Sequence, residues 1–163
     1  MRSRLMASIC IGFFGLVGCA GTPEHDNPLT AAPPLAPGMA RIWILRQINV
    51  AYENFATAEP AVFIVNVASS QNQVDLGHVE SGTVFFHDVA PGTYRLRAQP
   101  YGTRAHLTDT VRLGPGWTAF LQVQAIPNWQ GGSSVGGASF DVLTMVQQDA
   151  KAAIPTLRFV GAR

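Results

Sequence analysis

Apolar and polar residues alternate along much of the chain after Gly38. Over Thr93–Gln99 (TYRLRAQ) the alternation has no exception. A strand of an antiparallel sheet with one buried face and one wet face shows this pattern. We therefore expect one row of its side chains to be buried and the other to face water or an acidic partner. The buried row is Tyr94, Leu96 and Ala98, and the outward row is Thr93, Arg95, Arg97 and Gln99.

Other segments also have the composition of short strands and are bounded by Gly, Pro or Ser. One of them, Ala61–Val67 (AVFIVNV), is almost continuously apolar, which predicts a buried strand. The remaining segments are Ala40–Gln47, Val74–Val79, Thr83–Val89, Leu107–Leu113, Trp117–Ile126 and Ser139–Val146. About seven short strands with turns at near-regular intervals predict a mostly β protein, an antiparallel β-sandwich. A small barrel is the competing architecture.

Gly and Pro mark two turns between these segments. The run Gly114-Pro115-Gly116 predicts a hairpin that joins the strands before and after it. Pro91 and Gly92 predict a tight turn that starts the next strand, in which Gly92 supplies backbone freedom that other residues lack.

The C-terminal segment differs from the rest of the chain. Gln147–Ile154 (QQDAKAAI) consists of good helix formers, and Pro155 ends the run. This predicts one short C-terminal helix. The tail Thr156–Val160 is expected to form either a last strand or an exposed extension.

An apolar run near the N-terminus, Leu5–Val17, follows two arginines. It is shorter than the roughly 20 residues that a membrane-spanning helix needs, and its pattern is that of a signal peptide. The run ends in Leu16-Val17-Gly18-Cys19, which resembles the lipobox of bacterial lipoproteins. The resemblance implies cleavage before Cys19, whose thiol then carries a diacylglycerol and whose amino group is acylated. Stable membrane anchoring needs two or more acyl chains, which a lipidated Cys19 supplies.

Two other interpretations of this N-terminus stay open: a plain signal peptide with an incidental cysteine, and a short N-terminal membrane anchor. Ala20 occupies the position where aspartate retains many Gram-negative lipoproteins at the inner membrane, so the outer membrane is favoured. The expected organisation is a signal peptide at 1–18, a lipidated cysteine with a proline-rich tether at 19–38, a β-sandwich at 39–146 and a helix with a tail at 147–163.

The strand motifs resemble those of small uncharacterised bacterial lipoproteins that contain a domain of unknown function. Four stretches carry the resemblance, namely Ala40–Trp43, Leu76–Gly82, Asp88–Leu96 and Gly114–Gln122. The element Pro91–Leu96 is also similar to one in carboxypeptidase-regulatory-like and transthyretin-like sandwiches. The resemblance implies a β-sandwich carried by an envelope lipoprotein and brings no catalytic residues.

Charge and cysteine content exclude several functions. The formal net charge is +1 and the arginines are scattered, which argues against a nucleic-acid partner. The chain has two cysteines, Cys10 in the leader and Cys19 at the lipobox. Lipidation would therefore leave the mature domain without a thiol, which excludes a cysteine nucleophile, a zinc–thiolate site and a redox role.

Candidate chemistry is sparse. Gly132–Gly136 (GSSVG) matches the G-x-S-x-G pattern around Ser134, but a glycine-rich loop precedes it instead of a strand, so a hydrolase is the least favoured alternative. His78 with His87 is the best metal pair, yet no compact ligand spacing accompanies it. We expect no catalytic residues, no metal and no cofactor.

Binding is the function that these observations favour. We expect a non-enzymatic, lipid-anchored envelope protein that faces the periplasm and takes part in protein–protein interaction or envelope assembly. An edge strand at Ala40–Gln47 would recruit a partner strand by β-augmentation. The alternative is a small-ligand or glycan-binding module that uses three aromatic side chains in loops or at strand ends, Tyr101, Trp117 and Trp129.

Overall fold

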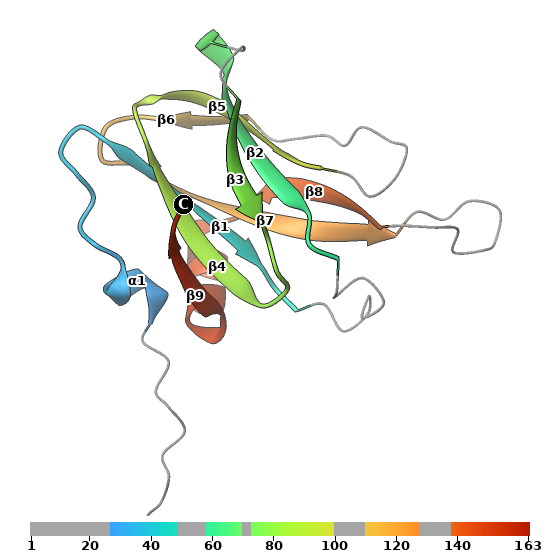
Figure 1. Ribbon diagram of the computed structural model, residues 1–163. Helices are drawn as coiled ribbons and strands as arrows, with labels where there is room; N and C mark the ends of the chain where they lie inside the picture. Colours follow the sequence, from blue (N-terminus) through green and yellow to red (C-terminus); the bar gives the residue numbers. More distant parts are fainter. Residues whose placement is uncertain (1–26, 49–57, 70–72, 100–109, 128–137) are drawn as a thin grey trace, which may run out of the picture.

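Two β-sheets stacked face to face form the protein in the computed structural model, which describes residues 27–48, 58–69, 73–99, 110–127 and 138–163 (Figure 1). The five-stranded sheet has the order β8-β7-β1-β4-β9, and the four-stranded sheet has the order β3-β2-β5-β6. The strands are β1 (Ala40–Arg46), β2 (Ala61–Asn66), β3 (Gln73–His78), β4 (Thr83–Val89), β5 (Gly92–Ala98), β6 (Thr110–Leu113), β7 (Thr118–Pro127), β8 (Ala138–Thr144) and β9 (Arg158–Ala162). The helical segments are α1 (Pro28–Ala31), η2 (Val67–Ser69), α2 (Gln147–Ala153) and η3 (Ile154–Thr156). The expected β-sandwich with a short C-terminal helix is confirmed.

Strand β1 lies in the middle of the five-stranded sheet, so our expectation that Ala40–Gln47 is an edge strand is wrong. It pairs antiparallel with β4 on one side and parallel with β7 on the other. All seven of its residues are buried, because both faces of this sheet are covered. Since both neighbours already use its backbone hydrogen-bonding groups, β1 cannot recruit a partner strand. A proline at Ile44 would remove a backbone donor from this central strand and disrupt the sheet.

The turn at Gly114–Gly116 carries the chain from one sheet to the other, so the predicted hairpin is also wrong. β6 pairs with β5 in the four-stranded sheet, whereas β7 pairs with β1 and β8 in the five-stranded sheet. The Gly116 N–H donates a hydrogen bond of 2.7 Å to the Met39 carbonyl and fixes the turn beside the start of β1. The local sequence signals a turn here, but it does not specify the sheet that the chain joins next.

Two strand pairs of the five-stranded sheet are parallel, where the alternation led us to expect antiparallel pairing throughout. They are β1 with β7 and β4 with β9. Parallel neighbours need a long crossover connection, and both connections include strands of the opposite sheet. The tail that follows α2 is therefore a strand, β9, and not an exposed extension.

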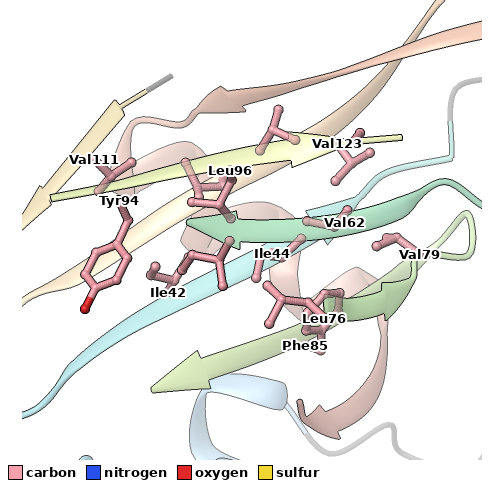
Figure 2. Packing of buried hydrophobic residues seen from close by; sticks show 14 of the residues in the cluster. Ile42, Ile44, Val62, Leu76, Val79, Phe85, Tyr94, Leu96, Val111 and Val123 are labelled. Carbon is pink, nitrogen blue, oxygen red and sulfur yellow. The ribbon is translucent and has the colours of Figure 1, made fainter. Parts of the chain in front are cut away.

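Inward-facing side chains of both sheets form the main core (Figure 2). Phe85 on β4 and Phe140 on β8 are the largest fully buried residues. On β5 the predicted alternation is confirmed, because the arginines and Gln99 are exposed while the residues between them are buried. These buried residues are Tyr94, Leu96 and Ala98.

A second apolar cluster covers the other face of the five-stranded sheet. Trp43, Phe86 and Phe159 pack together there, with ring centroids 5.3 Å apart for Trp43 and Phe86 and 6.1 Å apart for Phe86 and Phe159. Helix α2 and segment η3 close the cluster with Ala150, Ala153 and Ile154. The molecule thus has three layers: the four-stranded sheet, the five-stranded sheet and a thin helical layer.

Residues 27–32 pack on this helical side, although we expected them to belong to an extended proline-rich tether. Asn27 caps α1 by accepting a hydrogen bond of 3.1 Å from the Leu29 N–H at its side-chain oxygen. Leu29 and Ala32 then pack against the second apolar cluster. The proline-rich composition did not prevent docking, because Pro28 begins a helical turn and is itself buried.

A buried arginine ties this N-terminal segment to the sheet. Arg41 is 6% exposed and donates to both carboxylate oxygens of Asp88, at 2.6 and 2.8 Å. Its Nη1 donates to the Pro33 carbonyl at 2.8 Å, and its guanidinium lies 4.0 Å from the centre of the Phe86 ring. A buried cation is stable only with such partners, so Arg41 connects β1, β4 and the docked segment.

The turn before β5 is held by a tyrosine and requires a glycine for space. The Tyr94 hydroxyl donates 2.6 Å to the Ala90 carbonyl, an arrangement like the tyrosine corner of other β-sandwiches. Gly92 does not have a positive φ, so the backbone freedom that we expected to explain it does not. A Cβ at position 92 would lie 3.3 Å from the Tyr94 ring and 3.4 Å from the Asn66 amide nitrogen. Close approach is therefore the reason for glycine here.

Replacing Tyr94 with Phe should lower the free energy of unfolding by about 1 kcal/mol, since it removes this hydrogen bond and keeps the buried ring. Urea unfolding followed by fluorescence measures the change. Thr93→Val is the control, because it removes a hydroxyl from the neighbouring residue on the outward face and should change stability by less than about 0.5 kcal/mol. Equal effects of the two substitutions would contradict a structural role for the Tyr94 hydroxyl.

Candidate functional site

The outer face of the four-stranded sheet combines arginines with half-buried apolar side chains. Strand register places Val65 of β2 beside Arg95 of β5, and Phe63 beside Arg97. Arg112 of β6 lies opposite Thr93 of β5, one diagonal step from Arg95. We call this surface the arginine face and define it by Phe63, Val65, Arg95, Arg97 and Arg112.

The three arginines of this face differ from the other arginines in the described part of the chain. Within those residues, the side chains of Arg95, Arg97 and Arg112 form no hydrogen bond or ion pair, and all three are exposed. The remaining arginines use their guanidinium groups internally. Arg41 binds Asp88, Arg46 donates 2.9 Å to the Val79 carbonyl, Arg158 pairs with Glu80, and Arg163 donates to the Leu76 and His78 carbonyls.

A shallow hollow lies within this surface. Its volume is about 160 Å³, and it is lined by Val65, Val67, Gln73, Arg95 and Arg97. Val67, the first residue of η2, is 44% exposed, and together with Val65 it places apolar side chains next to two cations in the lining of the hollow. The volume lies below the 300 Å³ or so at which small-molecule pockets begin. The hollow therefore suits one side chain of a partner and is too small for a whole ligand.

Among the described residues, the acidic residue nearest to these arginines along the register is Asp75 on β3. It lies opposite Phe63, so Phe63 separates it from Arg97 across the sheet. Asp75 also accepts a hydrogen bond of 2.7 Å from the Gly77 N–H within its own strand. The positive charge of the face is thus not neutralised by a contact within the described residues.

No known family model matches this chain, and no curated protein matches it either. The geometry of the described residues therefore carries the functional argument. Within those residues, none of the helices has the length and apolar character needed to cross a bilayer.

The three aromatic residues expected to bind a ligand are only in part described. Trp117 is 60% exposed, and its ring packs over Gly114, where a Cβ would meet it at 3.2 Å. Tyr101 and Trp129 lie outside the described residues, as do Cys19 and the Ser134 motif. Strands β5 and β7, which precede Tyr101 and Trp129 in the sequence, end at the side of the sandwich opposite to Trp117.

The two histidines of the best metal pair lie on different sheets, His78 on β3 and His87 on β4. His87 Nδ1 contacts the Arg163 carbonyl, and the Arg163 guanidinium donates to the His78 carbonyl. Arg163, which directly follows β9, therefore bridges β3 and β4. Among the residues that the structure describes, there is no cluster of three or more potential metal ligands.

Sequence reasoning found two members of the arginine face and missed the others. The alternation identified Arg95 and Arg97, whereas Arg112 was not assigned to their surface. Phe63 and Val65 belong to a segment predicted to be a buried strand, but in the structure they are half-buried on the outer face. The sequence pattern that could have identified Arg112 is its position between the apolar residues Val111 and Leu113. This alternation directs Arg112 outward, like the arginines of β5.

Proposed function

We propose that this protein is a lipid-anchored, non-enzymatic component of the bacterial cell envelope that binds another envelope protein through the arginine face. The observation that carries the proposal is the set of three exposed guanidinium groups without partners in the described chain, placed beside an apolar hollow. Arginine is enriched in protein interfaces, where its planar group pairs with carboxylates and packs on apolar surface.

The position of the N-terminal segment supports this use of the face. Asn27 follows Cys19 by eight positions in the sequence, a distance that the chain spans by at most about 28 Å. Helix α1 packs on the helical layer, on the side of the five-stranded sheet away from the four-stranded sheet. With Cys19 lipidated, the helical side would lie near the membrane, and the arginine face, on the outer side of the other sheet, would point toward the periplasm.

Photo-crosslinking in the envelope tests the proposal on the full-length chain. A crosslinking amino acid at Thr110, which is exposed and opposite Arg95, should give a covalent product with a second envelope protein. The same amino acid at Ala152, exposed on α2 at the helical side, is the matched control and should give none of that product. Cys19→Ala should release the protein from the membrane fraction.

The binding surface and the lipid anchor can be contradicted separately. Equal products from positions 110 and 152, or no product from 110, would remove the arginine face as the binding surface. Unchanged membrane association of Cys19→Ala would remove the lipid anchor.

A further inference from the structure

We infer that the arginine face binds an extended acidic segment of its partner protein in which carboxylate residues alternate with apolar ones. This inference rests on the proposed function and specifies the chemistry of the partner. Three features of the face carry it: the spacing of the guanidinium groups, the apolar surface between the strands and the size of the hollow.

The spacing of the arginines matches that of an extended chain. Arg95 and Arg97 are two residues apart on β5, and side chains on one face of a strand repeat at about 6.8 Å. Two carboxylates separated by one residue in an extended segment have the same repeat. Arg112 lies diagonally from Arg95 and extends the positive surface onto β6. Each guanidinium can then hold one carboxylate with two parallel hydrogen bonds.

The apolar part of the face selects a polypeptide over other anions. Phe63 and Val65 lie beside the two arginines of β5, and Val67 adds an exposed apolar side chain at the hollow. A peptide that lies along the boundary between β2 and β5 can direct alternate side chains to its two sides, so that its carboxylates reach the arginines of β5 and its aliphatic side chains lie over Phe63 and Val65 of β2. A phosphate or a sugar carboxylate cannot bury apolar surface in this way. Nucleic-acid binding usually neutralises several phosphates with a larger set of basic residues than these three.

Binding assays with designed peptides test the inference on the detergent-solubilised full-length protein. One fluorescent peptide carries the alternating sequence Asp-Val-Asp-Val-Asp, and its block isomer carries Asp-Asp-Asp-Val-Val between the same flanking residues. Fluorescence anisotropy should show the alternating peptide binding at least about fivefold more tightly, because it places all its carboxylates along one side and both valines along the other, whereas the block isomer mixes the two kinds on each side. Its affinity should also fall as the salt concentration rises.

Substitutions on the face should weaken that binding without unfolding the protein. The double variant Arg95→Gln with Arg97→Gln should bind the alternating peptide about tenfold more weakly. Each exposed guanidinium–carboxylate pair contributes roughly a threefold factor to the affinity, and the two factors multiply. Lys151→Gln, which removes an exposed cation from α2 at the opposite side, is the matched control and should leave the affinity unchanged. Circular dichroism verifies that both variants keep the fold.

Other outcomes overturn the inference. Equal affinity for the two peptide isomers would mean that the protein recognises only the charge of the peptide. Unchanged binding by the double variant would mean that the acidic peptide binds at another surface. Tighter binding to anionic phospholipid vesicles or polyglucuronate than to the alternating peptide would assign the face to a different class of partner. If neither peptide binds but the crosslink from position 110 persists, this inference fails while the proposed function stands; loss of the crosslink as well removes both.

Discussion

Replacing Phe85 with Ala should lower the free energy of unfolding by about 3 to 5 kcal/mol, the range for removing a fully buried aromatic ring. Phe85 has no exposed surface and points from β4 into the space between the sheets (Figure 2). Its ring also lies 4.6 Å from the guanidinium carbon of Arg163, which bridges from the end of β9 to the carbonyls of β3. The substitution would open a cavity between the two sheets, where packing of one sheet on the other stabilises the fold.

Phe63→Ala is the matched control for this prediction. It makes the same chemical change on the half-buried outer face of β2, where the shortened side chain leaves no enclosed cavity. We expect a loss of about 1 to 2 kcal/mol from the smaller apolar area involved. Urea unfolding of both variants measures the difference, and equal losses would contradict the placement of Phe85 in the core between the sheets.

The parts of the fold that local sequence determines were predictable. The alternation on β5 separated Tyr94 and Leu96 from Arg95 and Arg97, because consecutive side chains of a strand point to opposite faces. Helix α2 was likewise predictable from its helix-forming residues and from Pro155, although the structure places Pro155 in η3, directly after α2. Both predictions need information from only a few consecutive residues.

The neighbours of each strand were not predictable in this way. The sequence of β1 (ARIWILR) reads as a strand, but its place between β4 and β7 depends on partners about 40 and 80 residues away. The same limit explains why the Gly114–Gly116 turn was misread as a hairpin. In retrospect, the run Ile42–Leu45 is apolar on both faces, which is typical of a strand covered on both sides.

The candidate site was predictable only strand by strand. Alternation shows that Arg95, Arg97 and Arg112 each face outward on their own strands. Their meeting on one surface with Phe63 and Val65 depends on the register of β2, β5 and β6, which pair across long sequence separations. Whether an arginine finds a partner also depends on the fold and not on its own strand. Arg41, for example, binds Asp88 and the Pro33 carbonyl, which lie on other segments of the chain.

Introducing aspartate at Ala150 should unfold the protein or destabilise it by at least about 3 kcal/mol. Ala150 has no exposed surface and faces the second apolar cluster, which includes Trp43 and Phe120 of the five-stranded sheet. A carboxylate there would lose its hydration without gaining a partner among these apolar side chains. Far-ultraviolet circular dichroism and thermal unfolding measure the loss.

Ala152→Asp is the matched control, because it places the same residue two positions later in α2 on the exposed side. Helix propensity falls in both variants, and an acidic residue near the helix C-terminus is if anything less favourable at position 152. If Ala152→Asp is much more stable than Ala150→Asp, the difference must come from the burial of position 150 against the sheet. If the two variants were equally stable, α2 would not be packed on the sheet, and the C-terminal segment would be free to serve as a separate binding element. The expected difference instead makes α2 a structural layer: it covers the membrane-proximal face of the five-stranded sheet in the proposed orientation and leaves the arginine face on the far side for the partner.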